Sequence, residues 1–87
     1  MQMFRDYLIS DGVVENQIVF LNFEDFENYK WQNDTEGLYY HIVNQLNLSK
    51  RCYVFLDEIQ QVKEFERLVA GLYVKPKINV IDWLLEN

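Results

Sequence analysis

Two short apolar runs constrain this chain more than any other feature of its sequence. The first is Ile-Val-Phe-Leu-Asn-Phe at residues 18–23, and the second is Cys-Tyr-Val-Phe-Leu-Asp at residues 52–57. Both are rich in residue types that favour strands, and neither alternates strictly between apolar and polar positions. Strands of this kind are covered on both faces, as in parallel sheets flanked by helices. We therefore expect two buried strands here.

The segments around these runs show helical spacing. Apolar residues recur every three or four positions over residues 1–10, 36–48 and 62–74. A third short strand is expected at residues 78–81, because Pro76 ends the helix before it. The alternation of helix and strand predicts an α/β fold with a short, mostly parallel three-stranded sheet flanked by helices. We expect residues 1–87 to form a single, partial domain.

The polar stretch at residues 27–35 is predicted to be a loop between the first strand and the next helix. Its aromatic residues Tyr29 and Trp31 are expected to cover an edge of the core. Either Asp34 or Thr35 can cap the following helix, because both side chains can accept a hydrogen bond from a free backbone N–H.

Charge and residue counts narrow the classes of function. The chain carries 8 Lys and Arg against 14 Asp and Glu, a net charge of -6, so phosphate backbones repel it and no nucleic-acid partner is expected. No apolar run approaches the roughly 18 residues of a membrane span. Cys52 is the single cysteine and cannot form an internal disulfide, which fits a reducing cytoplasm. We expect Cys52 to be a buried apolar side chain, and His41 to lie partly exposed on a helix.

The acids that follow the strands are the candidates for chemistry. Asp57 and Glu58 end the second strand, and Glu24 and Asp25 follow the first. Ligands of open parallel sheets bind beyond the carboxyl ends of the strands, so these carboxylates are placed where a hard cation could be held. The alternative is structural: each pair begins a loop, faces solvent or caps the next turn.

An apolar strand followed by Asp-Glu resembles the Walker B motif of P-loop ATPases. The wider sequence is more specific. Tyr-Val-Phe-Leu-Asp-Glu-Ile-Gln at residues 53–60, Phe-Glu at 65–66 and Gly-Leu-Tyr at 71–73 resemble a family of prokaryotic AAA-type ATPases. Residues 8–25 are similar to the linker and strand that precede this motif in the family, and the resemblance covers nearly the whole chain.

The resemblance implies roles for the acids. Asp57 would hold Mg²⁺, and Glu58 would activate a water for attack on the terminal phosphate of ATP. Glu24 and Asp25 would have at most an outer-shell role at the metal. The family's P-loop is absent, because none of the three glycines (Gly12, Gly37 and Gly71) belongs to a Gly-x-x-x-x-Gly-Lys-Ser/Thr pattern.

We therefore expect a central piece of an AAA-type ATP-binding domain, with the P-loop of the parent domain located before Met1. Mg²⁺ and ATP are cofactors of the parent family, but neither is expected to bind this chain by itself, and the chain alone is expected to be inactive as an ATPase. The alternative is a small self-associating or partner-binding α/β module with no nucleotide role.

Self-association is expected from the strand order that the resemblance implies. Without the P-loop strand, the edge of the strand at residues 78–81 would be unpaired, and an unpaired edge invites another chain. We expect a homodimer with residues 78–85 forming much of the contact and Trp83 as an anchor. The competing possibility is that residues 82–87 fold back over the edge.

Overall fold

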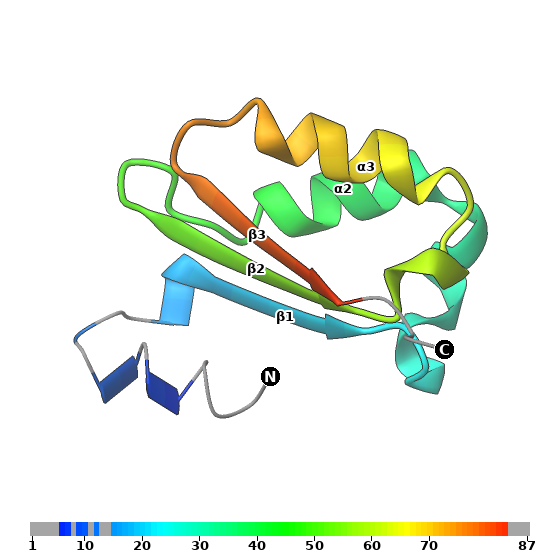
Figure 1. Ribbon diagram of the computed structural model, residues 1–87, viewed down its shortest axis with the longest axis horizontal. Helices are drawn as coiled ribbons and strands as arrows, with labels where there is room; N and C mark the ends of the chain where they lie inside the picture. Colours follow the sequence, from blue (N-terminus) through cyan, green and yellow to red (C-terminus); the bar gives the residue numbers. More distant parts are fainter. Residues whose placement is uncertain (1–5, 8, 11, 13–14, 84–87) are drawn as a thin grey trace.

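The sheet is the centre of this fold. The computed structural model describes residues 6–7, 9–10, 12 and 15–83 (Figure 1). In them, three strands form one sheet in the order β1-β2-β3, with bounds Ile18–Asn22, Cys52–Asp57 and Ile78–Trp83. Both pairings are parallel. The predicted α/β class and three-stranded parallel sheet are thereby confirmed.

Two helices cover one face of the sheet. Helix α2 (Thr35–Val43) connects β1 to β2, and helix α3 (Phe65–Tyr73) connects β2 to β3. They lie side by side above the strands in Figure 1 and contact one another. Because the strands are parallel and in register, all three end on the same side of the sheet, on the right of Figure 1.

The core fills the space between the sheet and these helices. Side chains alternate between the faces of a strand, and the buried positions on the helical side are apolar in every strand. The helices contribute Leu38, Ile42, Leu68 and Leu72, all buried. The opposite face also buries apolar surface: Phe55 is fully buried, with its ring centroid 6.3 Å from that of Phe20.

Helix α2 begins at an aspartate cap. The Gly37 N–H donates to Asp34 Oδ1 at 3.0 Å, so Asp34 is the cap among the two residues considered from the sequence. A Cβ at position 37 would collide with the Asp34 carboxylate, which explains the glycine in the first turn. The helix ends at Val43 and not at residue 48, because the chain turns so that the Asn47 N–H can donate to Asn16 O at 2.9 Å.

Two other sequence expectations are corrected. The segment predicted as a loop contains a 3₁₀ helix, η2 (Phe26–Asn33), in which Trp31 packs against the core but Tyr29 is 62% exposed. The helix predicted over residues 62–74 is divided. A short 3₁₀ helix, η3 (Ile59–Gln61), is followed by extended backbone at the buried Val62, and α3 starts only at Phe65.

The remaining expectations concern the ends of the chain and single residues. Residues 6, 7, 9 and 10 are helical, within the helix predicted over residues 1–10, whose other positions lie outside the described residues. β3 continues to Trp83, and residues 84–87, the rest of the segment considered for folding back over the edge, lie outside the described residues. Cys52 is buried and His41 is exposed on α2, as predicted.

Candidate functional site

Asp57 is the last residue of the central strand. In the parallel register it lies opposite Asn22, the last residue of β1, and opposite Trp83, the last residue of β3. The backbone of all three strands therefore ends at one level. Asp57 is half-buried. It shares a face with Phe55, two positions earlier, so its side chain lies on the face away from α2 and α3.

A tight turn follows β1 next to this aspartate. The Phe23 N–H donates to Asp57 O at 3.0 Å, and Asn22 Oδ1 accepts from the Glu24 N–H at 2.9 Å. Asp25 accepts from the Glu27 N–H at 3.2 Å and so caps η2. Glu24 and Asp25 are both exposed. This arrangement fits a loop start, one of the two roles considered for this pair; the other was an outer-shell role at a metal.

Glu58 adopts a backbone conformation that is unusual for its residue type. Its φ of 60° and ψ of 40° lie in the left-handed region, where a residue with a Cβ is strained. Its carboxylate is held by a side chain two positions later, because Gln60 Nε2 donates to Glu58 Oε1 at 2.6 Å. Strained residues that persist in a fold are concentrated at functional sites.

Gln60 is a residue of this turn that was not among the candidate site residues expected from the sequence. Its Oε1 is buried and accepts no hydrogen bond from any described residue. A buried acceptor without a donor is costly, so the position suits a water or another donor close to Glu58. Only its spacing from the acid pair could have indicated this role in advance.

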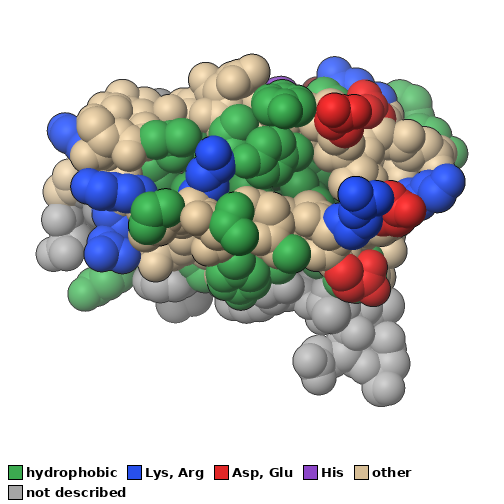
Figure 2. Space-filling model, turned by 90° about the horizontal axis from the view of Figure 1, so that it is seen from above, with side chains coloured by type: hydrophobic (Ala, Val, Ile, Leu, Met, Phe, Trp, Pro, Cys, Tyr) green, Lys and Arg blue, Asp and Glu red, His purple; other side chains and the backbone are tan. Residues whose placement is uncertain are grey.

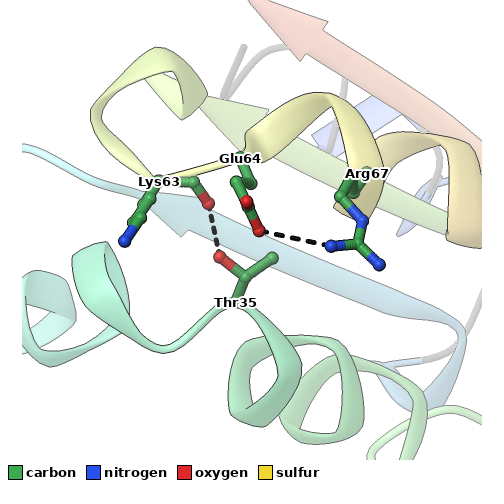
Figure 3. Close-up of polar contacts among 4 residues, drawn as sticks. All are labelled: Thr35, Lys63, Glu64 and Arg67. Atoms are coloured by element: carbon green, nitrogen blue, oxygen red, sulfur yellow. Dashed lines mark hydrogen bonds and ion pairs between the residues drawn. The ribbon is translucent and has the colours of Figure 1, made fainter.

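The segment after the acids is tied to η2 and α2. Gln32 Nε2 donates to Gln61 Oε1 at 3.0 Å, and the Lys63 N–H donates to Gln32 O at 2.8 Å. The Thr35 hydroxyl donates to Lys63 O, as Figure 3 shows. A second left-handed residue, Glu64, follows with φ of 57°. Residues 58–64 are therefore a strained segment that is held against the neighbouring helices by hydrogen bonds.

A cleft of about 630 Å³ lies between the first turns of α2 and α3, over the residues drawn in Figure 3. Lys63, Glu64 and Arg67 line it from one side. The other side is lined by Asn33, Asp34, Thr35, Glu36, Tyr39 and Tyr40, and neither Asp57 nor Glu58 takes part. In Figure 2, which looks onto the helices, the acidic side chains gather toward the end at which the strands terminate.

The side chains near Asp57 and Glu58 can be compared with the ligands that a metal ion requires. Among the described residues, no group of three or more His, Cys, Asp or Glu side chains could hold a metal ion. Mg²⁺ is commonly bound through one or two carboxylates together with phosphate and water oxygens. A half-buried carboxylate at a strand end, here Asp57, fits that mode.

The parallel three-stranded sheet with helices over one face is consistent with a class of protein, the α/β fold of the P-loop NTPase type. The family model described as "AAA domain" matches residues 1–82. The chain belongs to the AAA domain family.

One relative is an uncharacterized protein of Haemophilus influenzae, which is 32% identical over 82 residues. The alignment covers 93% of this chain and 20% of the relative, so the chain spans about a fifth of that protein's length. No solved structure matches the chain. Among the described residues, no helix is long and apolar enough to cross a membrane.

Proposed function

We propose that this chain supplies the metal-binding and water-activating side of an ATP site, with β2 and the turn after it as the Walker B segment. One observation carries the proposal. The half-buried Asp57 ends the central strand of a parallel sheet, at the level where β1 and β3 also end. Open α/β sheets bind their ligands at this edge, and AAA domains use it for ATP and Mg²⁺.

The two acids would have different tasks. Asp57 would hold Mg²⁺, which when bound neutralises charge on the phosphate oxygens. Glu58 would orient the attacking water and accept its proton, as a general base does. The hydrogen bond from Gln60 limits the rotation of the Glu58 carboxylate. The buried Gln60 Oε1 would accept a hydrogen bond from this water.

The chain by itself should bind nucleotide weakly. A triphosphate is normally cradled by the backbone N–H groups and lysine of a P-loop, and the sequence contains no Gly-x-x-x-x-Gly-Lys-Ser/Thr pattern. We therefore propose that it binds Mg-ATP no more tightly than millimolar and does not hydrolyse it alone. ATPase activity of a longer protein that contains this segment, in the cytoplasm, is part of the same proposal.

Two measurements test this function. Titration calorimetry with Mg-ATP should give a dissociation constant in the millimolar range or no binding, and a micromolar constant would contradict the proposal. Mn²⁺ added with ATP should broaden NMR signals of the amides nearest Asp57 first, because the paramagnetic effect is local. Asp57→Asn should remove this broadening, whereas Glu66→Gln, at an exposed acid of α3, should leave it unchanged. Equal broadening in Asp57→Asn would reject Asp57 as the metal ligand.

A second candidate function is self-association. In the described part of the chain, β3 is an outer strand that pairs with β2 alone. The backbone groups on its other side can pair with a further strand. A second copy of the chain is the simplest occupant, because two-fold association closes on itself. Such a dimer needs no nucleotide and would be formed largely by residues 78–85.

A further inference from the structure

The 3₁₀ helix η2 is an exposed aromatic element. None of its eight residues is buried, although Phe26, Tyr29 and Trp31 are all aromatic. Phe26 is 85% exposed and Tyr29 is 62% exposed. Large aromatic side chains usually anchor a core or an interface, since each can bury a large apolar area. Two of them exposed together mark an interaction surface.

The rings are ordered rather than scattered. Phe26 and Tyr29 stack with centroids 6.1 Å apart and ring planes 13° apart. Trp31 stacks on His41 of α2 at 4.8 Å. Together with Glu27, Asn28 and Lys30, these residues line a shallow hollow of about 660 Å³. We call the group formed by Phe26, Glu27, Tyr29 and Trp31 the η2 aromatic surface.

The charge around this surface selects a cation. Glu24, Asp25 and Glu27 are exposed where η2 begins. Aromatic faces are electron-rich and attract cations, and the nearby carboxylates add to that attraction while they repel phosphate. The chain already shows the preference: Lys30 Nζ lies 5.2 Å from the centroid of the Trp31 ring. Among the described residues, no Lys or Arg side chain lies over the ring of Phe26 or Tyr29.

We propose that the η2 aromatic surface binds an arginine-bearing segment of a partner protein. A guanidinium is planar and weakly hydrated, so it can stack on the exposed face of the Phe26–Tyr29 pair while it forms an ion pair with Glu27. Lysine can form the ion pair but cannot stack in the same way. Neither Asp57 nor Glu58 lines this hollow, and the proposal does not depend on an ATP site.

A peptide titration tests the proposal. The probe is the acetylated and amidated hexapeptide Gly-Arg-Gly-Arg-Gly-Arg, added to the ¹⁵N-labelled chain and followed by NMR. The amide signals of residues 26–31 should shift and saturate. The same peptide with citrulline in place of arginine keeps the shape but removes the charge, so it should shift them far less.

Three variants give the result its specificity. Phe26→Ser combined with Tyr29→Ser should weaken binding by about fivefold or more, the loss expected for two exposed cation–π contacts. Glu27→Gln should weaken binding and make it less sensitive to salt. The matched control is Tyr73→Ser on α3, where the tyrosine is 59% exposed, close to the exposure of Tyr29. Binding to this control should be unchanged.

Several outcomes would overturn the proposal. One is equal binding of the arginine and citrulline peptides. Another is unchanged affinity in the Phe26→Ser, Tyr29→Ser variant, or shifts that map to Asp57 and Glu58 instead of η2. Tighter binding of a uridine oligonucleotide would identify nucleic acid as the occupant. Shifts of residues 26–31 caused by raising the protein concentration alone would identify a second copy.

Discussion

Replacing Glu64 with glycine should raise the free energy of unfolding. Glu64 immediately precedes α3 with φ of 57° and ψ of 38°, and its side chain makes no capping hydrogen bond to the helix. A residue with a Cβ loses about 1–2 kcal/mol in this left-handed conformation. Glycine has no Cβ and adopts the conformation freely.

The expected size follows from three contributions. Relief of the left-handed strain stabilises by about 1–2 kcal/mol, whereas the greater freedom of glycine in the unfolded chain costs about 0.5–1 kcal/mol. The lost ion pair, Glu64 to Arg67 at 3.5 Å, joins side chains that are 54% and 80% exposed, so it contributes about 0.3 kcal/mol or less. The net stabilisation is about 0.5 kcal/mol.

Comparing Glu64→Gly with Glu64→Ala gives a larger expected difference in stability than comparing Glu64→Gly with the parent chain. Glu64→Ala loses the same ion pair but keeps the strain, so Glu64→Gly should be the more stable of the two by about 1 kcal/mol. In a helix interior the order is the reverse, with glycine about 1 kcal/mol worse than alanine. Ala70→Gly, at an exposed position inside α3, is therefore the matched control and should be destabilising.

Urea unfolding followed by far-UV circular dichroism measures these differences, provided that the variants share one slope of free energy against urea concentration. Glu58→Gly is a useful companion, because Glu58 has a similar backbone conformation but also accepts a hydrogen bond from Gln60. The increase in the free energy of unfolding should be smaller for Glu58→Gly than for Glu64→Gly. If Glu64→Gly proves less stable than Glu64→Ala, the left-handed strain is not what limits stability at this position, and the reasoning fails.

Three further predictions concern the acids, the thiol and the sheet edge. Asp57→Asn should change the free energy of unfolding by less than about 1 kcal/mol, because the described residues give the Asp57 side chain no hydrogen-bond or ion-pair partner; a larger loss in a urea melt would mean that Asp57 has a structural role. Burial raises the pKa of the Cys52 thiol, an effect that Lys77 partly offsets. The unfolded chain thus releases this proton at lower pH than the folded chain, so stability should fall as pH rises above the ordinary thiol pKa. Urea melts at neutral and alkaline pH should show this fall relative to Cys52→Ala, and an equal pH response in the two would contradict it. Sedimentation equilibrium at tens of micromolar should show a homodimer that Trp83→Ala shifts toward monomer; a 10.6 kDa species in the parent chain would exclude the dimer.

The sheet could be read from the sequence because its signal is local and strong. The apolar run of β2 has no polar face, and only burial on both sides of a sheet accommodates such a run. Its observed bounds, Cys52–Asp57, are those of the run itself. The position of Asp57 at the strand end follows from the same run. The role of Asp57 cannot be inferred from this run, because a single sequence does not show which groups lie near the end of a strand in the folded protein.

The parts that sequence reasoning missed depend on distant contacts or on backbone strain. Apolar spacing predicted that the helix around Leu68 starts at residue 62, but the left-handed Glu64 separates the two parts. Val62 is buried all the same, through extended backbone. The hydrogen bond between Gln60 and Glu58 joins two polar residues whose spacing is common on any surface. No periodicity indicates η2 either, since its eight residues include none that is buried.

The parallel register also determines how this chain can begin to fold. The sheet contains no hairpin: Ile18 pairs with Tyr53, and Cys52 pairs with Ile78. A strand pair therefore forms only after a whole crossover has been brought together, and this loop-closure entropy makes parallel pairing slow. β2 takes part in both pairings, so its central residues are expected to be organised in the transition state. During synthesis on a ribosome, β1 cannot pair until β2 has emerged, and the apolar surface of β1 stays exposed until then.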